Sequence, residues 1–325
     1  MLTALCRTMP ATHIHIVSLA SDGESRHAKV LINLCYRYQL SPNSPIYEHL
    51  SGLELRDLYV REDDLTADKD GKHVFKRCRN PFLSVLKSIL VHGVCITSSQ
   101  LCLHLLDSGK SPEHVNSVLN PSDKHDILLA FCLLKDMWTL PAANPLSHPA
   151  SYIATREAIC TYGEMCYHLI FPYICTNLSL DEQLEHLSAG VHLAVALFAD
   201  QKVRTDFLGI VLIVNIILMV KNVYFCVAKA KADLPNEPFF IILLGTDSLE
   251  SLFGILCTMV GNDANLDVLQ LGLCVTNTTE VATILAMHPE WGKGPRRLHL
   301  PHVDCEARTL PDNADHIGPS SFYPD

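Results

Sequence analysis

The stretch HIHIVSLASDG, residues 13–23, decides how the fold of this chain begins. Apolar and β-branched residues recur in it up to Ala20, and the turn-forming run Ser21-Asp22-Gly23 ends it. Such a pattern predicts a β-strand that ends in a turn. Helical periodicity follows in RHAKVLINLCYRY, residues 26–38, and stops at the proline-containing turn 41–45. We therefore expect a strand and a helix, the first step of an α/β layer.

A long helical segment follows from about residue 116. The run NPSDKH at 120–125 is typical of a helix start. Apolar faces at helical spacing then recur in residues 127–138, 152–170, 179–198 and 208–232. The run FFIILL at 239–244 predicts a short strand, and TDSLE at 246–250 predicts another helix start. The helical middle therefore interrupts the α/β layer rather than following it.

Composition limits the classes of function. Apolar residues make up 48% of the chain and charged residues 18%, which is enough for a sizeable core. The formal net charge is -10, so any contact with nucleic acid must be local. The 13 cysteines include no CxxC pair, and such scattered free thiols are typical of a reducing, intracellular compartment.

The sequence shows neither a signal peptide nor a clear membrane span. The first residues lack the basic start and long apolar run of a signal peptide. The strongest apolar run, residues 207–220, contains Asn215 and is shorter than the ~20 residues that a membrane helix needs. We expect this run to form a core helix or a pair of core strands, with no contact with a membrane.

Three carboxylates stand where they could carry chemistry. Asp22 ends the predicted first strand, which is a common place for a metal ligand. Asp22 followed by Gly23 is equally typical of a simple turn. Asp247 and Glu250 begin a predicted helix, where Asp247 as N-cap and Glu250 at the third position could instead form a capping box.

Basic residues gather in the segment 69–80, among them Lys72, Lys76, Arg77 and Arg79. Such a patch could bind DNA phosphates, because each neutralised phosphate releases a counterion. The alternative is a solvated helix face that balances the acidic stretch at 61–64. Lys124, at a helix start, could similarly face a nucleotide.

The order and spacing of these motifs resemble P-element-type (THAP-family) DNA transposases. ASDGESR at 20–26 resembles the family's "SDG…N/R" strand end, and DKDGKHVFKRCRN at 68–80 resembles its "D..H..K..RN" motif. NPSDKH resembles the "NPxDKQ" that opens a helical insertion. TDSLESLFG at 246–254 resembles the "D.LE..F" helix that closes the catalytic fold, and GNDAN at 261–265 resembles the "GG.NNNP" after it. The whole is similar to truncated transposase-derived proteins of mushroom-type fungi.

The resemblance implies an α/β protein with an incomplete RNase H-like fold, interrupted by a large all-helical insertion that binds GTP. It implies two Mg²⁺ ions, with Asp22 as the second catalytic and metal-binding carboxylate and Glu250 as the third. Asp247 and Lys124 would bind the nucleotide, and Lys72, Lys76, Arg77 and Arg79 would bind DNA.

The resemblance also implies four segments. Residues 1–115 are the first part of the RNase H-like domain, without its first strand and first Asp, and 116–235 are the GTP-binding-type insertion. Residues 236–290 close the RNase H-like domain, and 291–325 form a loose tail.

The departures from the family predict an inactive remnant. The first catalytic Asp would precede residue 1, the zinc-coordinating DNA-binding domain has no counterpart, and Cys257 stands where the family has Arg. We expect a nuclear protein whose partners are transposon ends and further copies of itself. Two alternatives remain open: a nucleotide- or DNA-binding module without catalysis, and a helical protein-interaction scaffold.

Overall fold

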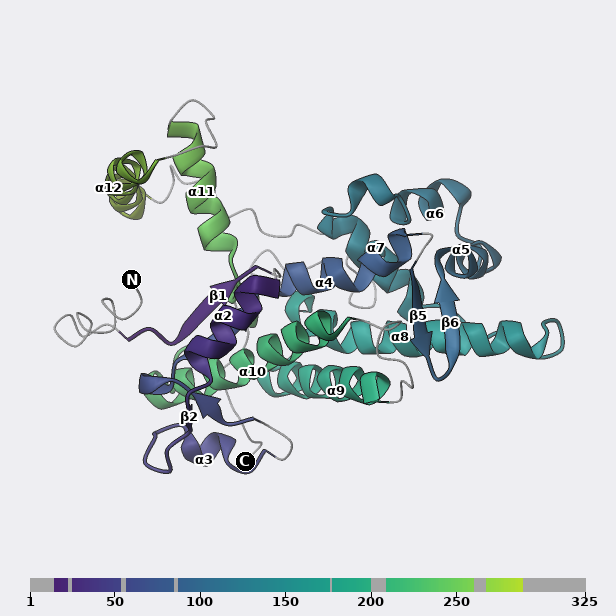
Figure 1. Ribbon diagram of the computed structural model, residues 1–325, viewed down its shortest axis with the longest axis horizontal. Coiled ribbons are helices and arrows are strands. Elements are labelled where there is room, and N and C mark those ends of the chain that lie inside the picture. Colours follow the sequence, from purple (N-terminus) through teal and green to yellow (C-terminus); the bar gives the residue numbers. More distant parts are fainter. Residues whose placement is uncertain are drawn as a thin grey trace. The chain divides into compact units, whose positions relative to one another are not determined.

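We describe the protein from a computed structural model. The structure describes residues 15–22, 25–53, 57–84, 87–175, 177–199, 209–259 and 267–288. They divide into two compact units, and each is described by itself. The first unit extends to Leu244 and the second begins at Gly245. Helices dominate the described residues, and the strands are short (Figure 1).

The first unit opens with a β–α–β arrangement. Strand β1 (Ser18–Ser21) pairs in parallel with β4 (Thr66–Lys69), so that Ser21 lies opposite Lys69. Helix α2 (Ser25–Cys35) lies in the connection between the strands and packs on β4. The predicted strand and helix are confirmed, although the helix ends at Cys35. The chain extends there because β2 (Tyr38–Gln39) pairs with β3 (Tyr59–Val60) in an antiparallel ladder.

Short elements fill the rest of this α/β part. They are α3 (Tyr47–Leu50) and the 3₁₀ turn η1 (Glu62–Asp64) before β4, and α4 (Gly71–Arg79) and the 3₁₀ turn η2 (Asn80–Leu83) after it. After these elements the chain forms a hairpin of β5 (Ser88–Val91) and β6 (Val94–Thr97). Its two turn residues, His92 and Gly93, both have positive φ angles, which suits the tight right-handed twist of such a hairpin.

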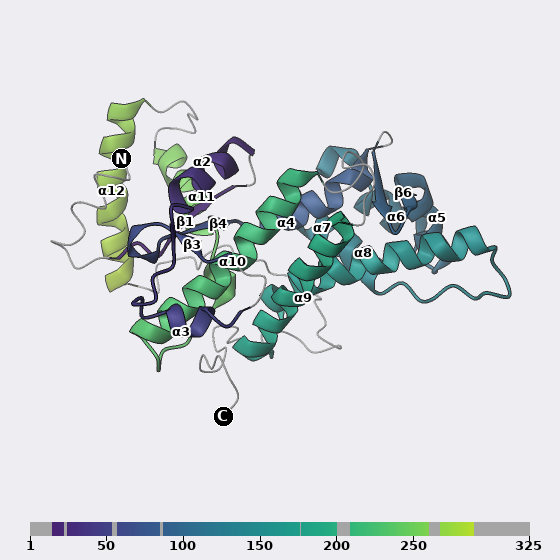
Figure 2. The ribbon, with the colours of Figure 1, turned by 60° about the horizontal axis from the view of Figure 1, so that its bottom comes forward.

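The helical segment follows the sequence pattern closely. Two short helices and a 3₁₀ turn lead into it: α5 (Ser98–Asp107), α6 (Pro112–Val118) and η3 (Pro121–Asp123). The four long helices are α7 (Ile127–Trp138), α8 (Ala150–Ile174), α9 (Leu180–Ala199) and α10 (Ile210–Asp233). Asn120 caps η3, whereas Asp126 caps α7. α8 packs against both α7 and α9, and α10 packs against α9 (Figure 2).

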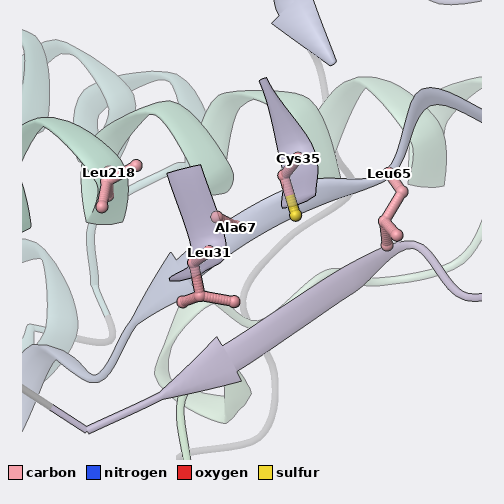
Figure 3. Packing of buried hydrophobic residues seen from close by; sticks show 5 residues of the cluster. All are labelled: Leu31, Cys35, Leu65, Ala67 and Leu218. Atoms are coloured by element: carbon pink, nitrogen blue, oxygen red, sulfur yellow. The ribbon is translucent and has the colours of Figure 1, made fainter. Parts of the chain in front are cut away.

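Helix α10 joins the helical segment to the strands. Leu218 of α10 packs in one buried cluster with Leu31 and Cys35 of α2 and with Leu65 and Ala67 at β4 (Figure 3). Residues from both sides of the expected boundary at 115 and 116 therefore share a core in one compact unit.

α10 is also the one helix of the described residues that is long and apolar enough to cross a membrane. The protein itself covers 78% of its apolar window. Asn215, Lys221 and Lys229 are buried within it. This is the pattern of a core helix, as we expected for residues 207–220.

One expectation near the end of the described chain is wrong. The run 239–244 forms a 3₁₀ turn, η4 (Ile241–Leu243), and pairs with no strand of the described residues. The helix start predicted at 246–250 is confirmed by α11 (Asp247–Met259), in which the Glu250 N–H donates to the Thr246 carbonyl. Thr246 is thus the N-cap, and Asp247 is the first helical residue.

The second unit pairs α11 with α12 (Val268–Met287). Asp267 begins α12 with a capping box, since its side chain accepts the Gln270 N–H and Gln270 bonds back to the Asp267 N–H. The expected tail at 291–325, the motif at 261–265 and the side chain of Cys257 lie outside the described residues.

Gly163 offers a test of this packing. A Cβ on Gly163 of α8 would lie 2.7 Å from main-chain atoms of Met137 and Trp138 at the end of α7. Backbone cannot move aside cheaply, so we expect Gly163→Ala to lower the free energy of unfolding by about 1–3 kcal/mol. Urea denaturation measures this, with Gly52→Ala as control because a Cβ there meets nothing within 4 Å. Equal unfolding midpoints for the two variants would contradict the close contact of α7 with α8.

Candidate functional site at the ends of β1 and β4

Two predicted motifs meet at the carboxyl ends of the parallel strands. Asp22 directly follows β1, and Asp70 directly follows β4 and begins α4. Parallel strands in register bring their carboxyl ends to one edge of the sheet, which is where α/β proteins commonly place their sites. Asp22 and Asp70, far apart in sequence, therefore lie at one edge.

Asp22 is surrounded by cationic or basic side chains. Its carboxylate is half exposed, and its Oδ1 lies 2.7 Å from Nδ1 of His27 on α2. The guanidinium of Arg77 on α4 interacts electrostatically with the same carboxylate. Burial lowers the pKa of Arg77, and the charge of Asp22 acts in the opposite direction.

Lys69 ties the two strand ends together. Its side chain is almost fully buried. Its Nζ donates to Ser21 Oγ at 2.6 Å and to the Asp22 main-chain carbonyl at 2.7 Å. The sequence pattern does not point to Lys69, because lysine is rarely buried and a lysine near the end of a strand normally faces solvent.

Asp70 and His73, the first two members of the "D..H..K..RN" pattern, form a local cap. Asp70 Oδ1 accepts the main-chain N–H of His73 at 3.1 Å, and His73 Nδ1 lies 3.3 Å from the same oxygen. This is the ordinary N-cap arrangement, which satisfies an amide at the start of α4.

Arg79 was expected to bind DNA, and the structure corrects this. Its side chain is fully buried. Its Nε donates to the Val118 carbonyl at 2.9 Å and its Nη1 to the Asp123 carbonyl at 2.7 Å. The guanidinium thus holds the loop that carries η3 and is not on the surface, where a phosphate would meet it.

The neighbouring Asn80 extends the same connection. With its amide turned so that the N–H groups face carbonyls, it donates to Lys124 O at 3.2 Å and to Lys76 O at 3.1 Å. Lys124 itself is exposed, and Lys72, Lys76 and Arg77 are partly exposed on α4. Arg79 and Asn80 therefore bring the basic segment of α4 next to the predicted nucleotide-binding Lys124.

A buried polar layer lies under the strands. Asn222 Oδ1 of α10 accepts hydrogen bonds from Ser18 Oγ at 2.8 Å and from Thr66 Oγ1 at 2.7 Å. Lys229 Nζ of α10 donates to the Val17 carbonyl at 2.6 Å. Asp68 of β4 is fully buried, and burial raises the pKa of its carboxyl to about 7, with a further contribution from the nearby Asp70.

The residues of the first unit do not by themselves fit a site for two Mg²⁺ ions. Such a site needs several carboxylates that converge on ions about 4 Å apart. Asp22 instead contacts His27, and the Lys69 ammonium is bound to its carbonyl. Glu250 and Asp247 belong to the second unit, so their meeting with Asp22 and Lys124 stays a prediction.

Comparison with known proteins places this fold. No protein-family model matches the chain, and no curated protein matches its sequence. Among solved structures, the chain is similar to the Drosophila P element transposase strand transfer complex, with a TM-score of 0.56 and 13% sequence identity. The match covers 84% of this chain and 62% of that one, so this chain spans less than two thirds of its length. The fold is therefore transposase-like.

Asp68 makes stability depend on pH. The unfolded chain loses this proton near the ordinary value of 3.8, whereas the folded protein keeps it up to about pH 7. Between about pH 4 and pH 7 the unfolded state thus binds fewer protons than the folded state. The free energy of unfolding should therefore fall as the pH rises through this range, by about 1.4 kcal/mol for each pH unit at most. Asp68→Asn should remove this part of the slope.

Urea denaturation at several pH values measures the slope. Glu157→Gln, which changes an exposed carboxylate of α8, is the control and should leave the profile unchanged. An Asp68→Asn profile parallel to that of the wild type would contradict the raised pKa.

Proposed function

We propose that this chain is a transposase-like DNA-binding protein. One observation carries the proposal: the basic segment of α4 begins at the edge where β1 and β4 end, and its other end lies next to Lys124. The transposase-like fold supports it, since the similar structure is that of a complex engaged in DNA strand transfer. The partner proposed for this edge is the phosphate backbone of DNA.

The charge distribution supports a local contact. With a net charge of -10, most of the surface repels DNA. Lys72, Lys76 and Arg77 follow one another along a single helix, and the bonds of Asn80 bring Lys124 to the carboxyl end of that helix. Four cations at this place can neutralise successive phosphates, and each contact releases a counterion.

We also propose that the protein does not cut DNA. The support comes from the surroundings of Asp22: His27 lies at 2.7 Å, and the buried Lys69 ammonium is bound to the adjacent carbonyl. Positive charge there repels a divalent cation. Binding of GTP through Asp247 and Lys124, nuclear location and self-association are further proposals from the resemblance.

DNA binding can be tested by fluorescence anisotropy with a labelled duplex at several salt concentrations. The double variant Lys72→Ala/Lys76→Ala should bind less tightly whatever the sequence. Its slope of log K against log salt should fall by about 0.9 for each lost phosphate contact.

The double variant Lys29→Ala/Lys87→Ala is the matched control, because it removes the same charge from exposed lysines that do not belong to α4. An equal loss in this control would show that only net charge matters. It would leave the α4 contact without support.

The absence of cleavage can be tested on supercoiled plasmid with Mg²⁺ or Mn²⁺. We expect no nicking above that of buffer, because the His27 ring occupies one oxygen of Asp22 and the Lys69 ammonium lies at its main-chain carbonyl. Nicking by the wild type that Asp22→Asn or Glu250→Gln abolishes would prove the protein an active nuclease.

A further inference from the structure

A second cluster of titratable side chains lies between α8 and α9, away from the strand ends. His168 of α8 and His186 of α9 face each other, and their Nδ1 atoms are 2.9 Å apart. The ring centroids are 4.9 Å apart. Two imidazole nitrogens this close must either share a proton or bind a common ion.

The two histidines open into a cavity of about 300 Å³. Its walls are mostly ligand-type side chains of α8 and α9 and the turn between them: His168, Leu178, Glu182, Glu185, His186 and Ala189. Neither lysine nor arginine lines it. Two carboxylates and two imidazoles therefore line the cavity, and it has room for an ion with bound water.

The acidic side chains act on both imidazoles. Glu185 interacts electrostatically with His168 and His186, and Glu182 interacts with His186. Glu164, one turn before His168 on α8, interacts with His168. Glu182 also caps α9 by accepting the Ser179 N–H at 2.7 Å, so Glu185 is the carboxylate best suited to a further ligand.

Aromatic rings hold the imidazoles in place. Tyr167 packs edge-on against both histidines, and Phe171 packs against His186. Burial lowers the pKa of His168 and of His186, and the mutual repulsion of the two rings lowers that of His186 further.

We propose that His168 and His186 bind a divalent transition metal ion of the zinc type, and that the carboxylate of Glu185, which lines the same cavity, turns toward the ion as the third ligand. Two histidines and one glutamate form a known zinc ligand set that leaves a position for water. Nitrogens bound to zinc at 2.0–2.1 Å with tetrahedral angles lie about 3.3 Å apart, so the observed pair needs to separate by only a few tenths of an ångström. Imidazole ligands favour Zn²⁺, Co²⁺ or Ni²⁺ over Mg²⁺.

Trp138 provides a direct reporter for this site. Its ring lies 5.6 Å from that of Tyr167, which in turn lies 5.4 Å from that of His186. The chain has two tryptophans, so Trp291→Phe leaves Trp138 as the sole indole emitter. In this background, Ni²⁺ bound between α8 and α9 should quench the Trp138 emission, and Zn²⁺ should compete with it.

The experiment compares Ni²⁺ titrations of the full chain with and without substitutions at the site. His168→Asn and His186→Asn should each weaken the quenching at least about tenfold. His192→Asn is the matched control, because His192 is an exposed histidine of the same helix. Glu185→Gln also changes an exposed side chain, and it should weaken binding even if the histidine variants fail to fold.

Two outcomes would overturn the proposal. One is no quenching by Ni²⁺ at concentrations up to about a millimolar, which corresponds to negligible affinity. The other is quenching that remains the same in His168→Asn, His186→Asn and Glu185→Gln, which would place the ion elsewhere, for example on one of the free thiols.

Discussion

The first unit depends on the contact between α10 and the two parallel strands. β1 and β4 have four residues each, and a two-stranded sheet of this length is marginally stable alone. α10 supplies what the strands lack. Leu218 adds apolar contact, and Asn222 gathers a hydroxyl from each strand on one amide oxygen. The strand ends, and the edge that carries Asp22, stand where they do because this helix is fixed beneath them.

A second connection extends the same construction to the helical segment. Arg79, the last residue of α4, donates to the main-chain carbonyls of Val118 at the end of α6 and of Asp123 in η3. A buried guanidinium with main-chain partners has few alternative positions, since moving it would leave a charge unsatisfied. α4 is therefore held at its start by the strand and at its end by Arg79. The basic face that we propose for DNA is rigid rather than adaptable.

The sequence was sufficient to predict long elements, in which the apolar pattern repeats several times, but not short ones. The helices at 127–138, 152–170, 179–198 and 208–232 could be predicted because their apolar faces repeat over several turns. The hairpin at 88–97 could not, because its strands have four residues each and His92-Gly93 is a weaker turn signal than Asn-Gly. FFIILL resembles a strand, but a strand needs a partner, and no pattern within six residues can show whether one exists.

The position of the candidate site could be predicted from the sequence, but the roles of its buried side chains could not. The motifs around Asp22 and Asp70 could be found from their order, and the parallel pairing does place them at one edge. The roles of Arg79 and Lys69 could not, because side chains that are normally exposed give no sign in the sequence of being buried. The pairing of His168 with His186 depends on how α8 crosses α9, which no spacing within one helix reveals.

Lys69 has a consequence for how this edge can change. Its ammonium bonds to the main-chain carbonyl of residue 22 and to the hydroxyl of Ser21, and the carboxylate of Asp22 takes no part in either bond. Every amino acid offers that carbonyl. The side chain at position 22 can therefore be replaced while both of these hydrogen bonds of Lys69 are kept. Evolution can thus change the chemistry of this edge without changing the backbone that forms it.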